Sequence, residues 1–214
     1  MADQPTSDVI DRIRSVRPPR RGGPRLDEAT LTRRQRQLLD ELGGRFDEGF
    51  AHLTMAELAA SLRCSLRTLY AIAPSRDTLV VTVIDRNLRT VGRRAVEAVT
   101  ADMGPLEAIQ AYLATANAAG RHTTTAFARD LQQVPAATAT HDAHDDHLVV
   151  VTRRLLDLAV ERGEIAPVDT YAVARVIASL GRDLADPEVL PRLDRSPSET
   201  ADEIVAVMIR GLRA

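Results

Sequence analysis

Cysteine, tryptophan and lysine are scarce or missing in this chain. The 214 residues include one cysteine, Cys64, which excludes a disulfide framework and a zinc site built from several cysteines. With no tryptophan and only three phenylalanines and three tyrosines, aliphatic side chains must supply most of the core. No apolar run approaches the length of a membrane span, and residues 1–10 lack the apolar segment of a signal peptide. We therefore expect a cytoplasmic protein with no membrane-spanning segment.

Because lysine is absent, all 28 basic residues are arginines, and they are unevenly distributed. Residues 1–100 hold 17 arginines and 13 acidic residues, whereas residues 101–214 hold 11 and 17. The excess of positive charge in the first half indicates an anionic partner for that half.

Residues 1–30 are predicted to be an arginine-rich flexible arm. Between residues 12 and 26 there are six arginines, no acidic residue, and prolines and glycines that exclude a long helix. The stretch fits a solvated tail, and it also fits a basic arm that contacts DNA phosphates or the minor groove.

The rest of the chain predicts an all-α fold of about nine helices, because its apolar residues recur with the helical period. Valine-rich stretches at 79–84 and 148–151 lie within longer helical patterns, so they do not predict strands. We expect a helix-turn-helix domain at residues 31–75 and a larger helical regulatory and dimerisation domain at 76–214. Beyond the first domain, helices are expected at about 76–99, 105–119, 123–133, 140–162, 169–185 and 198–212.

The segment from Thr54 to Leu79 predicts a helix-turn-helix. Thr54 and Glu57 have the spacing of a capping box, and Ser65 can cap a short second helix after a tight turn. The first residues of such a second helix meet base edges in the major groove of DNA. Arg67 can pair with the O6 and N7 atoms of guanine, and the Thr68 hydroxyl can donate or accept a hydrogen bond. A plain helical hairpin is the alternative. The candidate DNA-binding residues are Thr54, Arg63, Ser65, Leu66, Arg67, Thr68, Tyr70 and Arg76, the last two as phosphate contacts.

This segment resembles the DNA-binding half of the TetR family, the tetracycline-repressor-like regulators. The resemblance covers about residues 33–90 and departs from the family pattern at Arg63, Cys64, Arg67 and Ala73, where the family has a turn glycine, valine, a small residue and an aromatic. It implies a ligand-responsive repressor, whose effector would bind among the helices after residue 100. The matching residues are Gly49-Phe50, Leu53-Thr54, Leu58-Ala59, Ser65, Thr68-Leu69-Tyr70 and Arg76.

Three further groups of residues suggest binding sites. Polar and aromatic side chains between residues 112 and 132 can line a ligand cavity. A histidine and aspartate cluster suits either a solvated helix start or a metal site, with a helical metal-dependent hydrolase as the alternative function. Cys64 suits a core position or a redox sensor with a pKa lowered by Arg63 and Arg67. The ligand candidates are Tyr112, Asn117, Arg121, His122, Phe127, Arg129 and Gln132, and the metal candidates are His141, His144 and Asp145, with His147 nearby. We expect no resident cofactor.

The protein is predicted to be a homodimer on a palindromic operator, because one helix-turn-helix makes few contacts and two-fold symmetry matches such a site. The last two long helices carry wide apolar stripes that suit a dimer interface, although both could instead fill the core of one protomer. The stripes are Val173, Val176, Ile177, Leu180 and Leu184, and Ile204, Val205, Met208, Ile209 and Leu212.

Overall fold

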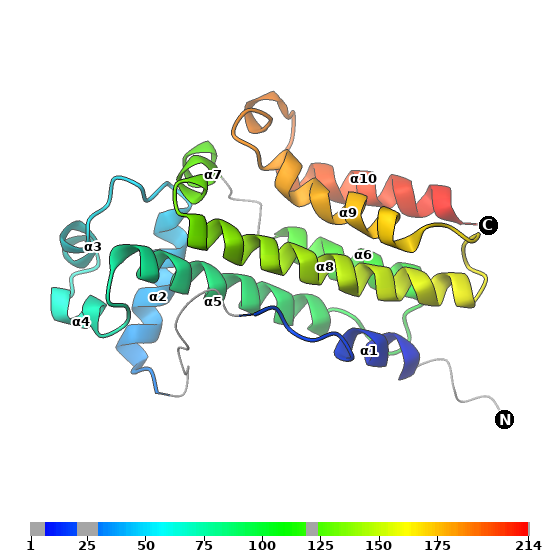
Figure 1. The fold of residues 1–214 in the computed structure, drawn as a ribbon, viewed down its shortest axis with the longest axis horizontal. Coiled ribbons are helices and arrows are strands. Elements are labelled where there is room, and N and C mark those ends of the chain that lie inside the picture. Colours follow the sequence, from blue (N-terminus) through cyan, green and yellow to red (C-terminus); the bar gives the residue numbers. More distant parts are fainter. Residues whose placement is uncertain (1–6, 21–29, 119–123, 214) are drawn as a thin grey trace. The chain divides into compact units, whose positions relative to one another are not determined.

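The structure is a computed structural model that describes residues 7–20, 30–118 and 124–213. Within these ranges the chain forms ten α-helices, a 3-10 helix at Leu190–Arg192 and no strand, so the predicted all-α fold is confirmed (Figure 1). None of the described helices combines the length and apolar character that crossing a bilayer requires. The α-helices are α1 (Ser7–Arg14), α2 (Arg33–Phe46), α3 (Met55–Ser61), α4 (Leu66–Tyr70), α5 (Arg76–Glu97), α6 (Pro105–Asn117), α7 (Thr125–Gln132), α8 (Pro135–Glu161), α9 (Thr170–Leu184) and α10 (Pro197–Leu212).

The described residues divide into two compact units. The first unit comprises those within Met1–Pro19, Thr90–His122 and His144–Ala214, and the second those within Arg20–Arg89 and Thr123–Ala143. The helix-turn-helix therefore shares its unit with α7 and with the first residues of α8. The predicted boundaries at residues 30 and 75 do not coincide with this division, because α5 and α8 each run through both units.

Side-chain caps start several helices where the sequence predicts them. The Thr54 hydroxyl accepts a hydrogen bond from the Glu57 N–H (3.2 Å), and the Glu57 carboxylate accepts one from the Thr54 N–H (2.8 Å). This second bond, to the charged form of the acid, lowers the pKa of Glu57. The predicted box at Thr54 and Glu57 is thus confirmed, and Ser196 and Glu199 form the same capping box at the start of α10.

The core of the second unit brings α2 close to α5 at Gly43. A Cβ atom added at Gly43 would lie 2.7 Å from the side-chain nitrogen of Asn87, whereas one added at Gly44 would meet nothing within 4 Å. The close approach of α5 therefore explains the glycine at position 43 and not the one at position 44. The core around this contact holds Leu38, Leu39, Leu42, Phe46, Leu58, Leu69, Leu79 and Val83.

In the first unit, α10 packs against both α6 and α9. The core between these helices and α8 is aliphatic, as the scarcity of aromatic residues requires. Tyr112 is its one aromatic member among the described residues. Its other members include Ile109, Leu113, Leu155, Leu156, Ile177, Val205 and Ile209.

The prediction of a flexible arm over residues 1–30 is wrong for Ser7–Arg14, which form α1. Val9 and Ile13, one helical turn apart, are 0% and 4% exposed and belong to the core of the first unit. Arg12 also forms an ion pair with Glu161 at the end of α8 (2.6 Å). Buried apolar side chains and an ion pair therefore hold α1 against the rest of the first unit. Residues 21–29 of the predicted arm lie outside the described residues.

Ile13→Ala is expected to lower the free energy of unfolding by about 2 kcal/mol, because it removes a buried aliphatic side chain and leaves a cavity. Urea denaturation measures the change. Arg14→Ala, at an exposed position of the same helix, is the control and should change stability by about 0.5 kcal/mol or less. Equal stability of the Ile13→Ala variant and the wild type would show that α1 contributes nothing to the core.

Helix α8 begins earlier than predicted. The sequence predicts a start near residue 140, with Pro135 in the preceding connection, but Pro135 is the first residue of α8. Proline is tolerated at this position because its fixed φ suits the first turn, where its missing N–H would have no helical acceptor. The 27-residue helix therefore includes the whole histidine and aspartate cluster in its first half.

Candidate nucleic-acid interface

The tight turn between α3 and α4 takes its shape from one strained residue and two arginines of α2. Arg63 has a φ of 50°, in the left-handed region that favours glycine. Arg34 donates a hydrogen bond to the carbonyl oxygen of Leu62 (2.8 Å), and Arg45 donates one to that of Ser61 (3.2 Å). The turn keeps its left-handed residue although arginine stands where the TetR pattern has glycine. Sequence reasoning missed both supporting arginines, which are 28 and 16 residues from their acceptors.

Helix α4 has one buried and one exposed face. The Ser65 hydroxyl caps the helix by accepting a hydrogen bond from the Thr68 N–H (3.1 Å), as predicted. Leu69 is fully buried, whereas Leu66 and Tyr70 are 42% and 51% exposed. Arg67 is also exposed, and Thr68 is half-buried with its hydroxyl 2.8 Å from that of Ser65. The structure thus brings Leu66, Arg67 and Tyr70 together on an outward face, next to the exposed Arg63.

Ala73 stands where the resemblance leads us to expect an aromatic, yet the end of this segment is well packed. Ala73 is 1% exposed and the neighbouring Ile72 is 5% exposed, and both belong to the core of the second unit. Ile72 therefore supplies apolar contact that the small side chain of Ala73 cannot.

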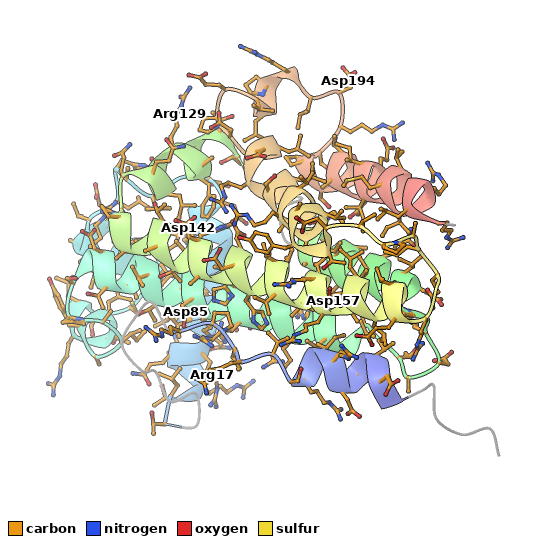
Figure 2. The ribbon with its side chains drawn as sticks, turned by 45° about the vertical axis from the view of Figure 1, so that its right-hand side comes forward. Arg17, Asp85, Arg129, Asp142, Asp157 and Asp194 are labelled. Atoms are coloured by element: carbon orange, nitrogen blue, oxygen red, sulfur yellow. The ribbon has the colours of Figure 1, made fainter. Side chains whose placement is uncertain are left out.

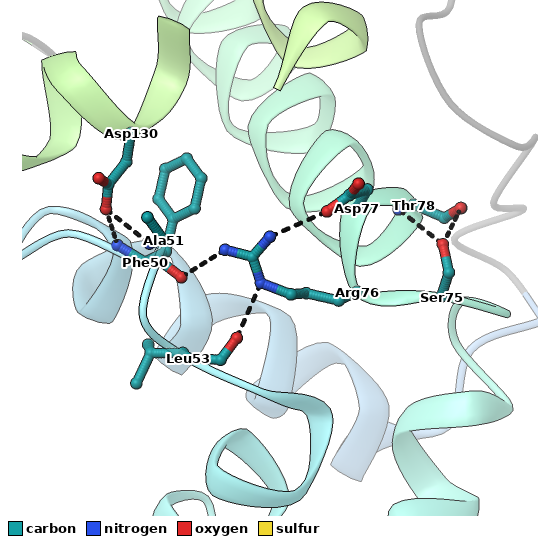
Figure 3. A network of polar contacts seen from close by, with 8 residues as sticks. All are labelled: Phe50, Ala51, Leu53, Ser75, Arg76, Asp77, Thr78 and Asp130. Atoms are coloured by element: carbon teal, nitrogen blue, oxygen red, sulfur yellow. Dashed lines mark hydrogen bonds and ion pairs between the residues drawn. The ribbon is translucent and has the colours of Figure 1, made fainter. Parts of the chain in front are cut away.

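Arg76, which the sequence predicts to contact DNA phosphate, binds protein groups in this structure. Its guanidinium donates to the carbonyl oxygens of Leu53 and Phe50, each at 2.7 Å, and to the carboxylate of Asp77 at 2.9 Å (Figure 3). The side chain is 26% exposed and lies 6.0 Å from the centre of the Phe50 ring. Arg76 therefore fixes the loop that leads into α3.

Cys64 is half-buried and packs against the core of the second unit. Burial raises the pKa of its thiol, and this effect outweighs the lowering by Arg34. The predicted lowering of the pKa by Arg63 and Arg67 is therefore wrong, and the residue fits the core position better than the redox sensor.

The histidine and aspartate cluster on α8 is engaged in contacts with protein groups. Arg182 of α9 forms an ion pair with Asp145 (2.9 Å), and Arg175 forms one with Asp146 (3.5 Å). His147 Nδ1 lies 3.2 Å from the carbonyl oxygen of Arg17. In the described part of the chain, no three His, Cys, Asp or Glu side chains are grouped to hold a metal ion, so nothing there supports the candidate site at His141, His144 and Asp145.

The predicted ligand-binding residues lie in different units or outside the described residues. Tyr112, in the first unit, is 2% exposed, and burial raises its pKa to about 12. In the same unit, Asn117 donates a hydrogen bond to Asp202 of α10 (2.8 Å). Phe127 and Arg129 are on α7 in the second unit; Phe127 packs against Phe50, and Arg129 points away from its helix (Figure 2). Gln132, the last residue of α7, is exposed, and Arg121 and His122 lie outside the described residues.

The two predicted apolar stripes are mostly used within the protomer. Ile177, Val205 and Ile209 are core residues, and most of the other members are half-buried against the same core. An outward apolar surface remains on both helices, because Val176 of α9 is 52% exposed and Val207 of α10 is 59% exposed.

Comparison with solved structures identifies the fold. A TetR-family regulatory protein from Rhodococcus RHA1 superposes with a TM-score of 0.65 at 18% identity over 86% of this chain and 99% of its own. The chain has the TetR fold. A TetR-family regulator from Agrobacterium tumefaciens gives a TM-score of 0.67 at 15% identity over 85% and 98% of the two chains. Reduced NemR from E. coli gives 0.66 at 15% identity, also over 85% and 98%.

No protein-family model and no curated protein matches the sequence of this TetR-fold chain. The likeness to known proteins is therefore one of fold.

Proposed function

We propose that this chain is a TetR-family transcriptional regulator that binds a palindromic operator as a homodimer. The observation that carries the proposal is the outward face of α4, where Leu66, Arg67 and Tyr70 are exposed on a capped helix-turn-helix within a TetR fold. A large apolar residue and an aromatic at such a position have no role in the core and suit thymine methyl groups and the DNA backbone.

The test is selection of DNA from a pool of random-sequence duplexes by the purified full-length protein. The expected product is an inverted repeat whose half-sites are one helical turn apart or a multiple of it, because each protomer places one α4 in the major groove. Enrichment of no sequence over the starting pool would contradict the proposed function.

Arg67 is the residue proposed to read a base. Arg67→Ala is expected to cost about 1–3 kcal/mol of binding on the selected operator and to relax preference at one base position, because a bidentate contact with guanine is lost. Fluorescence anisotropy with operator and scrambled duplexes measures both effects.

Arg93→Ala is the matched control for Arg67→Ala. It removes an exposed arginine of α5 that forms a long ion pair with Glu97 (3.8 Å), so it changes net charge equally without touching α4. It should leave operator preference unchanged. Equal losses for Arg67→Ala on operator and scrambled duplexes would make Arg67 a phosphate contact.

The dimer is proposed to form through the outward faces of α9 and α10. Val176 and Val207 leave apolar surface exposed on these neighbouring helices, and an interface there would bury it.

We further propose a small-molecule effector that binds in the first unit and favours the state that cannot bind DNA. The coupling free energy between effector binding and DNA binding is typically about 1–3 kcal/mol. Tyr112 and Asn117 remain candidates for that contact.

A further inference from the structure

The loop between α2 and α3 is held by a carboxylate from α7. The Asp130 carboxylate accepts a hydrogen bond from the backbone N–H of Ala51 (2.6 Å) and another, very short one from that of Phe50 (Figure 3). The Thr124 hydroxyl, which caps α7, also donates to the carbonyl oxygen of Asp47 in the same loop. Two groups of α7 therefore bind the backbone that precedes the helix-turn-helix.

Close packing makes this contact depend on Gly49. Its φ is 99°, and an added Cβ would lie 3.0 Å from the Ala126 side chain and 3.1 Å from the Asp130 carboxylate. Beside it, the Phe50 ring meets the edge of Phe127, with 6.0 Å between ring centres. The glycine and the aromatic that follows it thus fit the loop onto α7.

The same loop is held from its carbonyl side by Arg76. Asp130 accepts hydrogen bonds from two N–H groups, and Arg76 donates to two carbonyl oxygens, so both kinds of backbone group have charged partners. Phe50 is bound by both side chains through its two backbone groups. The loop leads directly to Thr54, the cap of α3.

We propose that Asp130 is a positioning residue for DNA binding, which acts through the Phe50–Thr54 loop on the placement of α3 and α4. The inference rests on the proposed function. It makes α7 a part of the DNA-reading unit, although α7 lies far from the helix-turn-helix in the sequence and outside the segment that the resemblance covers. A movement of α7 would release the two N–H groups and loosen the loop.

The test compares Asp130→Asn with the wild type in the full-length protein. The amide keeps the size of the side chain but loses the charge that strengthens both hydrogen bonds, so we expect operator binding at least about tenfold weaker. Glu48→Gln, which removes one negative charge from an exposed side chain of the same loop, is the matched control and should bind like the wild type. The probe is a duplex of roughly 30 base pairs that the wild type enriches from a random pool.

Amide hydrogen exchange separates positioning from general destabilisation. In Asp130→Asn, the amides of Phe50 and Ala51 should exchange at least about tenfold faster, with the melting temperature within about 2 °C of the wild type. Thr124→Val, which removes the neighbouring hydrogen bond, should loosen the same loop to a smaller extent.

Operator affinity of Asp130→Asn within about twofold of the wild type would overturn the proposal. Faster exchange throughout the chain with a lower melting temperature would also overturn it, in favour of a general role in stability. If the wild type enriches no duplex, the proposed function fails, and the role of Asp130 in DNA binding fails with it. If the wild type enriches a duplex that Asp130→Asn binds equally well, only the role of Asp130 fails. Amide exchange at Phe50 and Ala51 reports the loop contact in either case.

Discussion

Val176→Asp combined with Val207→Asp is expected to convert the protein from a dimer to a monomer at micromolar concentration. Both valines are more than half exposed in the protomer, so the change should leave the fold intact, whereas an interface would have to bury unpaired carboxylates. Because two linked half-sites bind far more tightly than one, operator affinity should fall by at least about 100-fold. Analytical ultracentrifugation and anisotropy measure the two effects.

Val150→Asp is the matched control for the dimer variant. Val150 is a 44% exposed valine on α8, outside the proposed interface, and its replacement adds the same kind of charge. This variant should remain dimeric and bind the operator normally. If the Val176→Asp, Val207→Asp variant still sediments as a dimer, the dimer interface does not lie on these faces of α9 and α10.

Arg76→Ala is expected to lower the free energy of unfolding by about 3 kcal/mol and to weaken binding to every duplex. The physical reason is the loss of two charge-assisted hydrogen bonds, each worth about 1.5–3 kcal/mol, which leaves the carbonyl oxygens of Phe50 and Leu53 without their donor. Urea denaturation measures stability, and a salt series of anisotropy titrations measures binding.

Arg76→Lys is the informative companion to Arg76→Ala. Lysine keeps the positive charge but lacks the planar fork that reaches two carbonyl oxygens at once, so stability should recover only in part. A phosphate contact would behave differently. In that case Arg76→Ala would leave stability unchanged and lower the salt slope by about one unit, and Arg76→Lys would restore binding.

Local signals in the sequence predicted much of the fold. The spacing of Thr54 and Glu57, the cap at Ser65 and the apolar period place α3, α4 and the later helices, because these features depend on neighbouring residues. Helix α1 was missed because an eight-residue helix is too short to be stable alone, and its buried residues Val9 and Ile13 stabilise it only when it packs against the core. Its helical state depends on docking against residues far along the chain.

The contacts that position the site could not be predicted in the same way. Arg76 appears in the sequence as a basic residue at a helix start, which fits a phosphate contact, whereas in the structure it donates to backbone carbonyls 23 and 26 residues away. Asp130 is 80 residues from Phe50, and nothing in its local sequence marks it as a loop anchor. Only the tertiary structure shows which arginines remain exposed and which bind the backbone.

If the exposed face of α4 reads DNA sequence, the wild type must distinguish the selected duplex from a scrambled duplex of equal length. Equilibrium binding to both duplexes across a salt series measures this. We expect affinity for the selected duplex at least about 1,000-fold higher, and affinity for both duplexes that falls as salt rises. Equal affinity for the two duplexes at every salt concentration, or binding that salt does not change, would contradict this expectation.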